Sequence, residues 1–287
     1  MMVLKKIICG DSRNMEELGK NTVDLVVTSP YYRNAIDYQN HIQKKWYRTS
    51  SKYSTREYIT EMKIHFKEAY RVVKNGGICC VIIGNELDTE DGSIVPLPSY
   101  LTAMMTRSLK WKLQEEIIWY KVTGGKKRFK VTVKIPYPTY YYANILHENI
   151  LIFRKGDKRH TRNEADRIIL NDVAKKEVAN SVWHIPPVPP NHIDHPCPFP
   201  EDLAYRLILL YSNKGETVLD NFNGSGTTTK VASKLKRDFV GYDMEKKYCR
   251  IARQRLKSEL NLRMPLIPVW TKNKENLFSS FQVNGEV

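Results

Sequence analysis

The sequence predicts a doubly wound α/β domain built on a mostly parallel β-sheet. Short apolar runs rich in β-branched residues recur along the chain, and stretches with helical periodicity separate many of them. Residues 25–27 and 78–83 are apolar throughout, as expected of strands that are buried on both faces of a sheet. The 287 residues suffice to bury a large core in one such domain, with room for a smaller appended region.

Seven short runs are the candidate strands, and five longer periodic stretches are the candidate helices. Gly76 and Gly77 follow the first long helix and are expected to end it before the next strand. The alternation predicts a seven-stranded sheet with Rossmann-like connections. The expected strands are residues 3–9, 23–28, 78–84, 113–120, 149–154, 217–220 and 239–242, and the expected helices are residues 55–74, 98–110, 200–212, 226–236 and 245–259.

The chain is strongly basic, with 46 lysines and arginines against 31 aspartates and glutamates and a net charge of +15. Such an excess favours a polyanionic partner, and nucleic acid is the commonest one. A basic but otherwise ordinary enzyme surface is the alternative, because net charge says nothing specific about fold.

The cysteine count and the apolar runs narrow the class of protein further. The five cysteines form no Cys-x-x-Cys pair, which argues against a zinc site or a disulfide framework. The longest apolar runs are far shorter than the roughly 18 residues that a membrane span needs. A reduced, cytoplasmic protein without a bound metal is therefore expected.

A glycine turn late in the chain is the strongest local motif. The expected strand at residues 217–220 ends in Asp220, and Gly224-Ser225-Gly226 then leads into a helix. Asp243 follows the next strand, where nucleoside-binding α/β folds place an acceptor for ribose hydroxyls. A dinucleotide fingerprint wants a third glycine where this chain has Thr229, so a nucleoside ligand without a pyrophosphate fits better. A mere tight turn is the alternative.

Several ordered blocks between residues 8 and 256 together resemble one enzyme family. The chain is similar to the S-adenosylmethionine-dependent amino-group DNA methyltransferases, in the permuted (beta-type) N4-cytosine/N6-adenine family whose catalytic block precedes the cofactor block. The resemblance implies a Rossmann-like methyltransferase fold with a small target-recognition region. The matching blocks are CGDSRNMEEL, TSPYY, VVKNGGICCVIIGN, EEIIWYKVTGG, HENILIFRK, VWHIPP with HPCPFPEDLAYRLI, VLDNFNGSGTT and FVGYDME.

Two positions depart from the family pattern. Tyr31 stands where the Thr-Ser-Pro-Pro-Tyr-like signature has its second proline, and Asn221 replaces the usual proline after the turn aspartate. Neither change removes a group that the chemistry needs. Tyr31 lacks the fixed φ of proline and should make the loop less rigid, which leaves room for altered activity.

By this resemblance, the corner at residues 28–32 is the catalytic segment. Ser29 Oγ and the Pro30 carbonyl are suited to accept hydrogen bonds from the exocyclic amine of a flipped base. Tyr32 is expected to offer a face on which that base stacks, and Tyr31 either stacks too or packs inward. A structural alternative is a strand-ending turn with two half-buried tyrosines.

The resemblance also implies a set of residues for S-adenosylmethionine. Asp11 would lie near the adenine, Asp243 would bind the ribose, and the segment from His195 to Phe199 would close over the methionine end. A Pro196-Cys197 dipeptide raises the alternative of cytosine C5 methylation through a cysteine nucleophile, but it precedes the helix before the cofactor turn and does not stand at the catalytic strand end. The remaining cofactor candidates are Thr28, Asp220, Phe222, Gly224, Ser225, Gly226 and Thr227.

Target recognition is assigned to basic loops with interleaved aromatics. The expected organisation is a catalytic half (residues 1–120), basic insertions around a core strand (residues 121–190, with the strand at 149–154), a cofactor half (191–260) and a peripheral tail (261–287). The DNA-binding candidates are Lys44, Lys45, Arg48, Lys126, Lys127, Arg128 and Lys130.

Ser29 bears on which base is methylated. In the family that the chain resembles, serine at this position usually accompanies cytosine N4 and aspartate usually accompanies adenine N6. The expected reaction is therefore N4 methylation of cytosine in double-stranded DNA, with adenine N6 as the alternative. A partner restriction endonuclease and an oligomer are possible associations. An RNA methyltransferase and a non-catalytic DNA-binding module remain as different classes.

Overall fold

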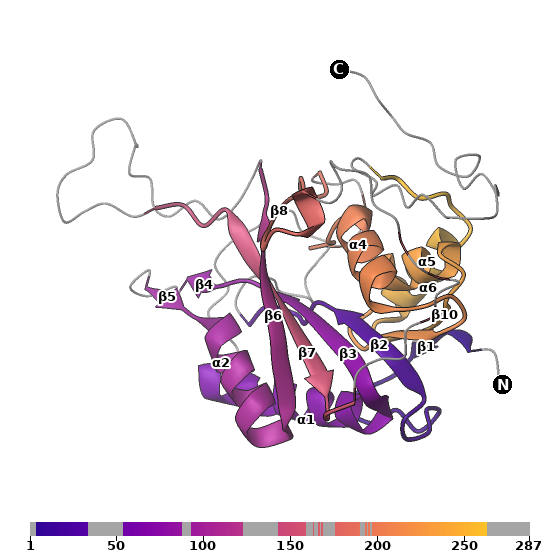
Figure 1. Cartoon of the computed structure of the whole chain (residues 1–287), viewed down its shortest axis with the longest axis horizontal. Coiled ribbons are helices and arrows are strands. Elements are labelled where there is room, and N and C mark those ends of the chain that lie inside the picture. Colours follow the sequence, from indigo (N-terminus) through magenta and orange to yellow (C-terminus); the bar gives the residue numbers. More distant parts are fainter. Residues whose placement is uncertain are drawn as a thin grey trace, which may run out of the picture.

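The computed structural model describes residues 4–33, 54–87, 93–122, 143–158, 163, 166, 168, 176–189, 193, 195 and 197–262. Its centre is an eight-stranded sheet with the strand order β1-β10-β9-β2-β3-β7-β6-β8, covered by helices on both faces (Figure 1). Only β7 runs antiparallel to its neighbours, so the doubly wound, mostly parallel α/β fold is confirmed. The strands are β1 (Lys5–Cys9), β2 (Val23–Thr28), β3 (Val73–Ile83), β6 (Trp111–Tyr120), β7 (His147–Lys155), β8 (Val182–His184), β9 (Thr217–Asp220) and β10 (Asp238–Asp243).

The prediction of seven strands is corrected by β8. This strand has three residues and pairs in parallel with the end of β6, where Trp183 lies opposite Trp119. Trp183 is fully buried while its two neighbours are exposed. Three residues carry too little periodicity for a sequence-based assignment, so pairing to β6 decides the strand. A separate two-stranded ribbon joins β4 (Glu86–Leu87) and β5 (Ile94–Val95).

Helices cover the two faces of the sheet in separate groups. α1 (Thr55–Val72) and α2 (Leu97–Ala103) pack on one face, and α4 (Glu201–Tyr211), α5 (Thr227–Lys234) and α6 (Lys246–Arg255) pack on the other (Figure 1). α1 starts at a capping box, in which Ser54 accepts from the Glu57 N–H and Glu57 accepts from the Ser54 N–H.

Two predicted boundaries were wrong. α1 ends at Val72 and β3 follows at once, so Gly76 and Gly77 lie inside the strand rather than at its start. A Cβ on Gly77 would lie 2.7 Å from the Val73 side chain and 2.8 Å from the Asp24 carbonyl, which explains why glycine is needed at this shift in register with β2. The expected helix at residues 98–110 instead splits into α2 and a π-helical turn, Met104–Ser108.

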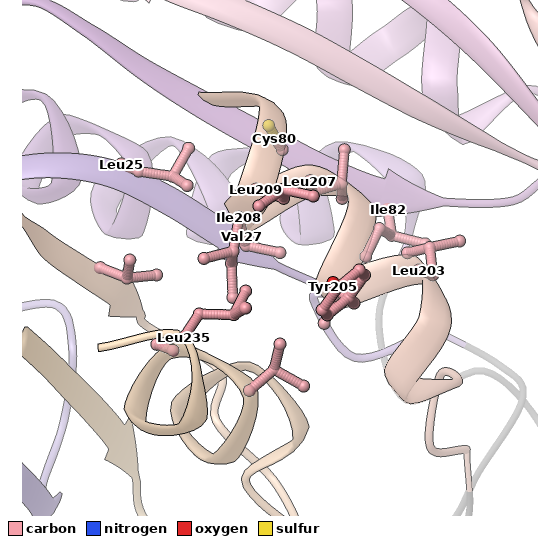
Figure 2. Close-up of a cluster of buried hydrophobic side chains, with 14 of the residues drawn as sticks. Leu25, Val27, Cys80, Ile82, Leu203, Tyr205, Leu207, Ile208, Leu209 and Leu235 are labelled. Atoms are coloured by element: carbon pink, nitrogen blue, oxygen red, sulfur yellow. The ribbon is translucent and has the colours of Figure 1, made fainter. Parts of the chain in front are cut away.

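The alternation of side chains along the central strands builds two cores. Leu25, Val27, Cys80 and Ile82 point toward α4 and α5, where they pack with Leu203 and a set of further apolar residues (Figure 2). Val26, Cys79 and Val81 point to the opposite face, against α1 and α2. Each fully buried Leu, Ile or Val contributes roughly 1.5–3 kcal/mol, so this central block dominates the stability of the fold.

The strand order places the switch point between β9 and β2. From β2 the chain moves to β3 on one side, and from β9 it moves to β10 on the other. Crevices at such points, outside the carboxyl ends of parallel strands, are the usual ligand sites of open α/β sheets. The end of β6 and the start of β7 lie at the same edge. None of the helices in the described ranges is long and apolar enough to cross a membrane.

Candidate active site

The carboxyl ends of β2 and β9 bring together the two motifs found in the sequence. Thr28 is fully buried, and its hydroxyl donates a hydrogen bond of 2.7 Å to Asp220 Oδ1. Thr228 Oγ1 in α5 donates to the Val27 carbonyl over 3.1 Å. The first of these buried hydrogen bonds joins the catalytic corner (residues 28–32) to the glycine turn (residues 220–227), and the second joins the residues directly beside them.

Asp220 connects the two strands and is only 1% exposed. Burial raises the pKa of its carboxyl group to about 6, although hydrogen bonds from Thr28, Thr228 and the Phe222 N–H lower it in part. Its Oδ1 accepts from both the Thr28 hydroxyl and the Phe222 N–H. In this arrangement the hydrogen bond between Asp220 and Thr28 holds the ends of β9 and β2 together at the site.

Ser29 is the polar side chain of the corner that remains available. It is partly exposed, and its hydroxyl makes no hydrogen bond to any residue in the described ranges. Pro30 is buried beside it and has no N–H, so its backbone offers an acceptor only. Ser29 and Pro30 thus place two oxygen acceptors in the residues that directly follow β2.

Tyr32 corrects the expectation of an open stacking face. Its ring is 5% exposed, and its hydroxyl accepts a hydrogen bond of 3.2 Å from the Gly84 N–H. Burial and then the neighbouring Glu148 raise the pKa of this phenol well above its usual value. The ring can be buried because the Gly84 N–H, directly after β3, and Glu148 of β7 are polar partners for its hydroxyl group.

Tyr31 packs inward, the second of the two possibilities left open by the sequence. Its ring meets those of Tyr58 and Phe222 edge to face, with centroids 5.7 Å and 6.0 Å away. The Tyr58 hydroxyl also donates to the Tyr31 carbonyl over 2.9 Å. The loop in which Tyr31 replaces the family's second proline is therefore held by aromatic contacts with α1 and with the glycine turn.

The glycine turn has the backbone that its sequence requires. Gly224 and Gly226 have φ angles of +47° and +81°, a region that side chains disfavour. A Cβ on Gly224 would lie 2.6 Å from His195 Nε2, and one on Gly226 would lie 2.6 Å from Ala252 Cβ. His195 thus covers the turn, as predicted, and its ring rests against Tyr248.

Asp243 lies beside this turn at the end of β10. Its Oδ2 accepts from the Gly224 N–H and its Oδ1 from the Glu245 N–H, both over 2.8 Å. Burial raises the pKa of the carboxyl group despite these two hydrogen bonds. Met244, next in sequence, is 62% exposed and offers an apolar surface at the same strand end.

Asp11 stands after β1 on the far side of β10. The Arg13 guanidinium and N–H both bond to its carboxylate and lower its pKa, although partial burial acts in the opposite sense. Ser12 bonds to His65 Nδ1 of α1 over 2.8 Å, and the His65 ring lies 4.7 Å from that of Phe222. The predicted adenine-side and turn residues are therefore joined through His65, a residue that the sequence did not single out.

Arg255 is a second residue that the sequence reasoning missed. Its guanidinium donates to the Ser225 carbonyl over 2.8 Å, to Ser225 Oγ over 3.1 Å and to Thr227 Oγ1 over 3.2 Å. It also pairs with Glu201 at the start of α4 over 2.8 Å, and Lys230 pairs with the same carboxylate. The Ser225 and Thr227 hydroxyl oxygens, predicted to bind cofactor, accept hydrogen bonds from Arg255.

Phe199 is partly buried at the end of the segment that precedes α4. It lines a cavity of about 420 Å³ together with Arg255, Lys230 and four residues of the segment 186–189. None of the remaining predicted cofactor residues lines this cavity. The cavity adjoins the turn through Arg255, which bonds to both Ser225 and Thr227.

Asn221 is buried, and neither of its side-chain polar atoms has a hydrogen-bond partner in the described part of the chain. The family pattern has a proline here, which would bring no polar side chain into this position. A buried amide without partners costs free energy. The structure offers no contact that explains the replacement.

Cys197 lies closer to the catalytic corner than its sequence position suggested. Its thiol is exposed, and its charge would act on both Tyr32 and Lys121. Separation along the chain therefore does not exclude it from the site, and its role as a nucleophile stays untested. The seven basic residues predicted to bind DNA lie outside the described residues.

Taken together, the switch point between β9 and β2, the glycine turn and the strand-end acid are typical of α/β proteins that bind a nucleoside-type ligand. Comparisons with known proteins give the particular family. Residues 23–254 match the DNA methylase family N6_N4_Mtase. The chain therefore belongs to the DNA methyltransferases that act on exocyclic amino groups, as the sequence motifs predicted.

Relatives agree with this family over most of the chain. The chain is 29% identical to the type II methyltransferase M.HpaI of Haemophilus parainfluenzae, over 90% of this chain and 76% of that protein. The PvuII DNA methyltransferase (cytosine-N4-specific) has a TM-score of 0.67 at 18% identity, covering 90% of this chain and 88% of that one. A candidate DNA modification methylase from Thermus thermophilus, complexed with S-adenosyl-L-methionine, has a TM-score of 0.64 at 24% identity, covering 87% and 93%.

The family uses S-adenosylmethionine as its methyl donor, which confirms the predicted cofactor. The residues of this chain fit such a group. Two glycines at positive φ keep side chains out of the turn, where a Cβ would collide with its neighbours. A strand-end carboxylate at Asp243 and the exposed Met244 stand beside that turn.

Proposed function

We propose that this chain transfers a methyl group from S-adenosylmethionine to the N4 amine of a cytosine flipped out of duplex DNA. The observation that carries the proposal is the available Ser29 hydroxyl at the end of β2, one residue from the Thr28–Asp220 link to the glycine turn. This arrangement holds an amine acceptor next to the region where the cofactor would bind. The match to the DNA methylase family supports it at the level of the reaction.

The chemistry explains why oxygen acceptors are needed here. When bound, S-adenosylmethionine supplies an electrophilic sulfonium methyl group. The exocyclic amine is a weak nucleophile because its lone pair is delocalised into the ring. In the proposal, Ser29 Oγ and the Pro30 carbonyl accept hydrogen bonds from the two N–H groups of the amine, which orient the lone pair in line with the methyl group. They also stabilise the positive charge that develops on nitrogen before it loses a proton.

The cofactor contacts are proposed from the same geometry. Asp243 would accept from the ribose hydroxyls, Asp11 and Met244 would lie on the adenine side, and His195 would cover the methionine end over Gly224. Phe222 connects these groups to the catalytic corner through its contact with Tyr31. Thr28, Asp220, Ser225 and Thr227 would support the site without touching the cofactor.

Duplex DNA would bind through two basic segments, and residues 121–190 would carry most of the target recognition. Lys44, Lys45 and Arg48 would form one group of phosphate contacts, and Lys126, Lys127, Arg128 and Lys130 the other. Because each neutralised phosphate releases counterions, binding should weaken steeply with salt. Titration of a labelled duplex between 50 and 200 mM salt measures the slope, on the order of −0.9 per phosphate contact. A flat response would contradict this footprint.

The base and the site are tested by one experiment. A mixed-sequence plasmid is incubated with the protein and S-adenosylmethionine, and the products are analysed by nucleoside mass spectrometry and site-resolved sequencing. N4-methylcytosine at a defined site is expected. N6-methyladenine alone would overturn the cytosine assignment and leave the family intact. If no product forms and calorimetry detects no binding of S-adenosylmethionine, a non-catalytic DNA-binding module is favoured. Methylation of RNA in place of DNA would show that the substrate is RNA.

A partner endonuclease would place the chain in a restriction-modification system. The named relatives include type II methyltransferases, which supports this setting. Expression in a host, followed by challenge of its DNA with restriction enzymes that cut at the mapped site, tests whether the methylation protects.

A further inference from the structure

A buried ion pair lies beside the catalytic corner, outside the residues assigned so far. Lys121 Nζ bonds to Glu148 Oε1 over 2.5 Å, with side chains that are 18% and 9% exposed. Lys121 directly follows β6, and Glu148 is the second residue of β7. Both therefore lie at the edge of the sheet that carries the end of β2.

Three contacts connect this pair to the catalytic corner. Glu148 hydrogen-bonds to the Tyr32 hydroxyl. A Cβ on Gly84 would lie 2.7 Å from Glu148 Cγ and 3.4 Å from the Tyr32 hydroxyl, so glycine permits their approach. The exposed Cys197 is within electrostatic range of both Tyr32 and Lys121, so it lies near the pair as well as near the corner.

An ion pair in this position is costly for folding alone. Removing two charges from water costs several kcal/mol per ion, and an apolar pair of similar size would often be as stable. The pair also differs from the ion pair at the opposite end of β6, where Lys112 meets Asp157 on an exposed surface. A buried cation at the active-site edge therefore calls for a partner besides Glu148.

The geometry leaves the lysine capacity for such a partner. An ammonium group has three N–H donors. Glu148 takes one of them, and the ammonium lies 4.8 Å from the centroid of the Trp119 ring. Because Glu148 balances its charge, Lys121 can donate without placing an unpaired positive charge beside a reacting amine.

We propose that Lys121, held by Glu148, is a specificity-determining residue that donates a hydrogen bond to the ring nitrogen next to the reacting amine. That nitrogen is N3 in cytosine, an acceptor, whereas thymine carries an N–H at the same position and would be rejected. This inference rests on the proposed function, since it requires a flipped base with its amine at Ser29 and Pro30. In adenine the corresponding acceptor is N1.

The test is a double-mutant-type cycle, in which the lysine of the protein and the ring nitrogen of the base are each changed alone and then together. K121M keeps most of the aliphatic stem and removes the donor, and 3-deazacytosine replaces N3 by C–H while keeping the amine. Single-turnover methylation is measured on duplexes that carry the mapped site with either base. Each change alone is expected to reduce kcat/KM by about 10- to 100-fold, the range for a hydrogen bond to a charged group. Combined, they should cost little more than either one. Additive losses would overturn the proposal.

Two controls separate recognition from folding. K112M removes a lysine from the same strand and should change neither the rate nor its response to 3-deazacytosine. K121M leaves Glu148 buried without its cation and would destabilise the fold, so the cycle is repeated with K121M/E148Q, in which both charges are gone. The melting temperature and the Kd for S-adenosylmethionine are recorded for every variant. An unchanged response to 3-deazacytosine in the stable double variant would assign the pair a structural role only.

The outcome is independent of the proposed cytosine specificity. If the wild-type product is N6-methyladenine, the cycle is run with 1-deazaadenine, which removes the acceptor next to the adenine amine. Coupling there would retain the role of Lys121 while the cytosine assignment fails. If the product is N4-methylcytosine and the losses from K121M and 3-deazacytosine are additive, the role of Lys121 fails while the cytosine assignment stands.

Discussion

The glycine turn and the catalytic corner lie next to each other, yet they are held in place by different kinds of contact. The turn is shaped by its own backbone, with positive φ at Gly224 and Gly226 and a backbone N–H bound to Asp243. The corner has little local structure of its own. It depends on the Tyr58 hydroxyl of α1, the Gly84 N–H directly after β3 and the Glu148 carboxylate of β7, which are distant in sequence. A local motif can thus specify the cofactor side, whereas the substrate side requires the assembled fold.

Replacing the corner acceptor should have the largest effect. S29A removes the hydroxyl that would orient the amine, so kcat should fall by about 100-fold or more while binding of S-adenosylmethionine stays unchanged. Rapid-quench methylation and calorimetry measure the two quantities. An unaltered kcat would show that Ser29 takes no part in the reaction. A loss of cofactor affinity as large as the loss of kcat would show that Ser29 also contributes to the cofactor side.

Breaking the support of the glycine turn should act on the cofactor instead. R255M removes three hydrogen bonds to Ser225 and Thr227 and leaves Glu201 with Lys230. The Kd for S-adenosylmethionine should rise about tenfold, with kcat at saturation little changed. Arg250 on the same helix is exposed, and R250M is the matched control. A fall in kcat without a change in Kd would mean that the turn needs no such support.

His65 connects Ser12, beside Asp11, to Phe222 of the glycine turn and should make stability depend on pH. Burial lowers its pKa to about 4, from 6.5, although Asp11 partly opposes the shift. The unfolded chain then takes up a proton that the folded chain refuses, so this stability is fully present above pH 6.5 and is lost as the pH falls toward 4. The total is on the order of 3 kcal/mol.

Urea unfolding of the wild type and H65N between pH 7.5 and 4.5 measures this effect. The difference between the two proteins should shrink as the pH falls. Burial raises the pKa of Asp220 to about 6, which has the opposite dependence, with stability lost as the pH rises through 6. That contribution is common to both proteins and cancels in their difference. A difference that stays constant with pH would place His65 in a protonated or exposed state.

Cys197 should give the smallest effect. C197A removes an exposed thiol near Tyr32 and Lys121 and is expected to change kcat less than about threefold, because methylation of an amine needs no covalent attachment of the base. Loss of all activity, together with a covalent adduct between Cys197 and DNA in the wild type, would support the C5 mechanism in place of amine methylation.

The elements predicted from sequence differ in how well they agree with the structure, and local encoding explains the difference. β2 and β9 have the predicted bounds because uninterrupted apolar runs and flanking turn residues mark both ends. β8 was missed because three residues cannot show a period, and Gly76-Gly77 was misassigned because a bulge inside a strand resembles a helix stop. In the site, His195 approaches the glycine turn, and Phe199 from the same motif lines a cavity beside Arg255. Their predicted contacts with the cofactor stay predictions.

The sequence by itself determined the fold class, the order of strands and helices, the glycine turn and the family, because each depends on residues that lie within about 20 positions of one another. The tertiary structure decided that Tyr32 is buried, that Arg255 supports Ser225, and that Lys121 meets Glu148 beside the corner. These contacts join segments separated by some 30 to 120 residues. Their energies depend on distance and burial, which no local pattern of residues encodes.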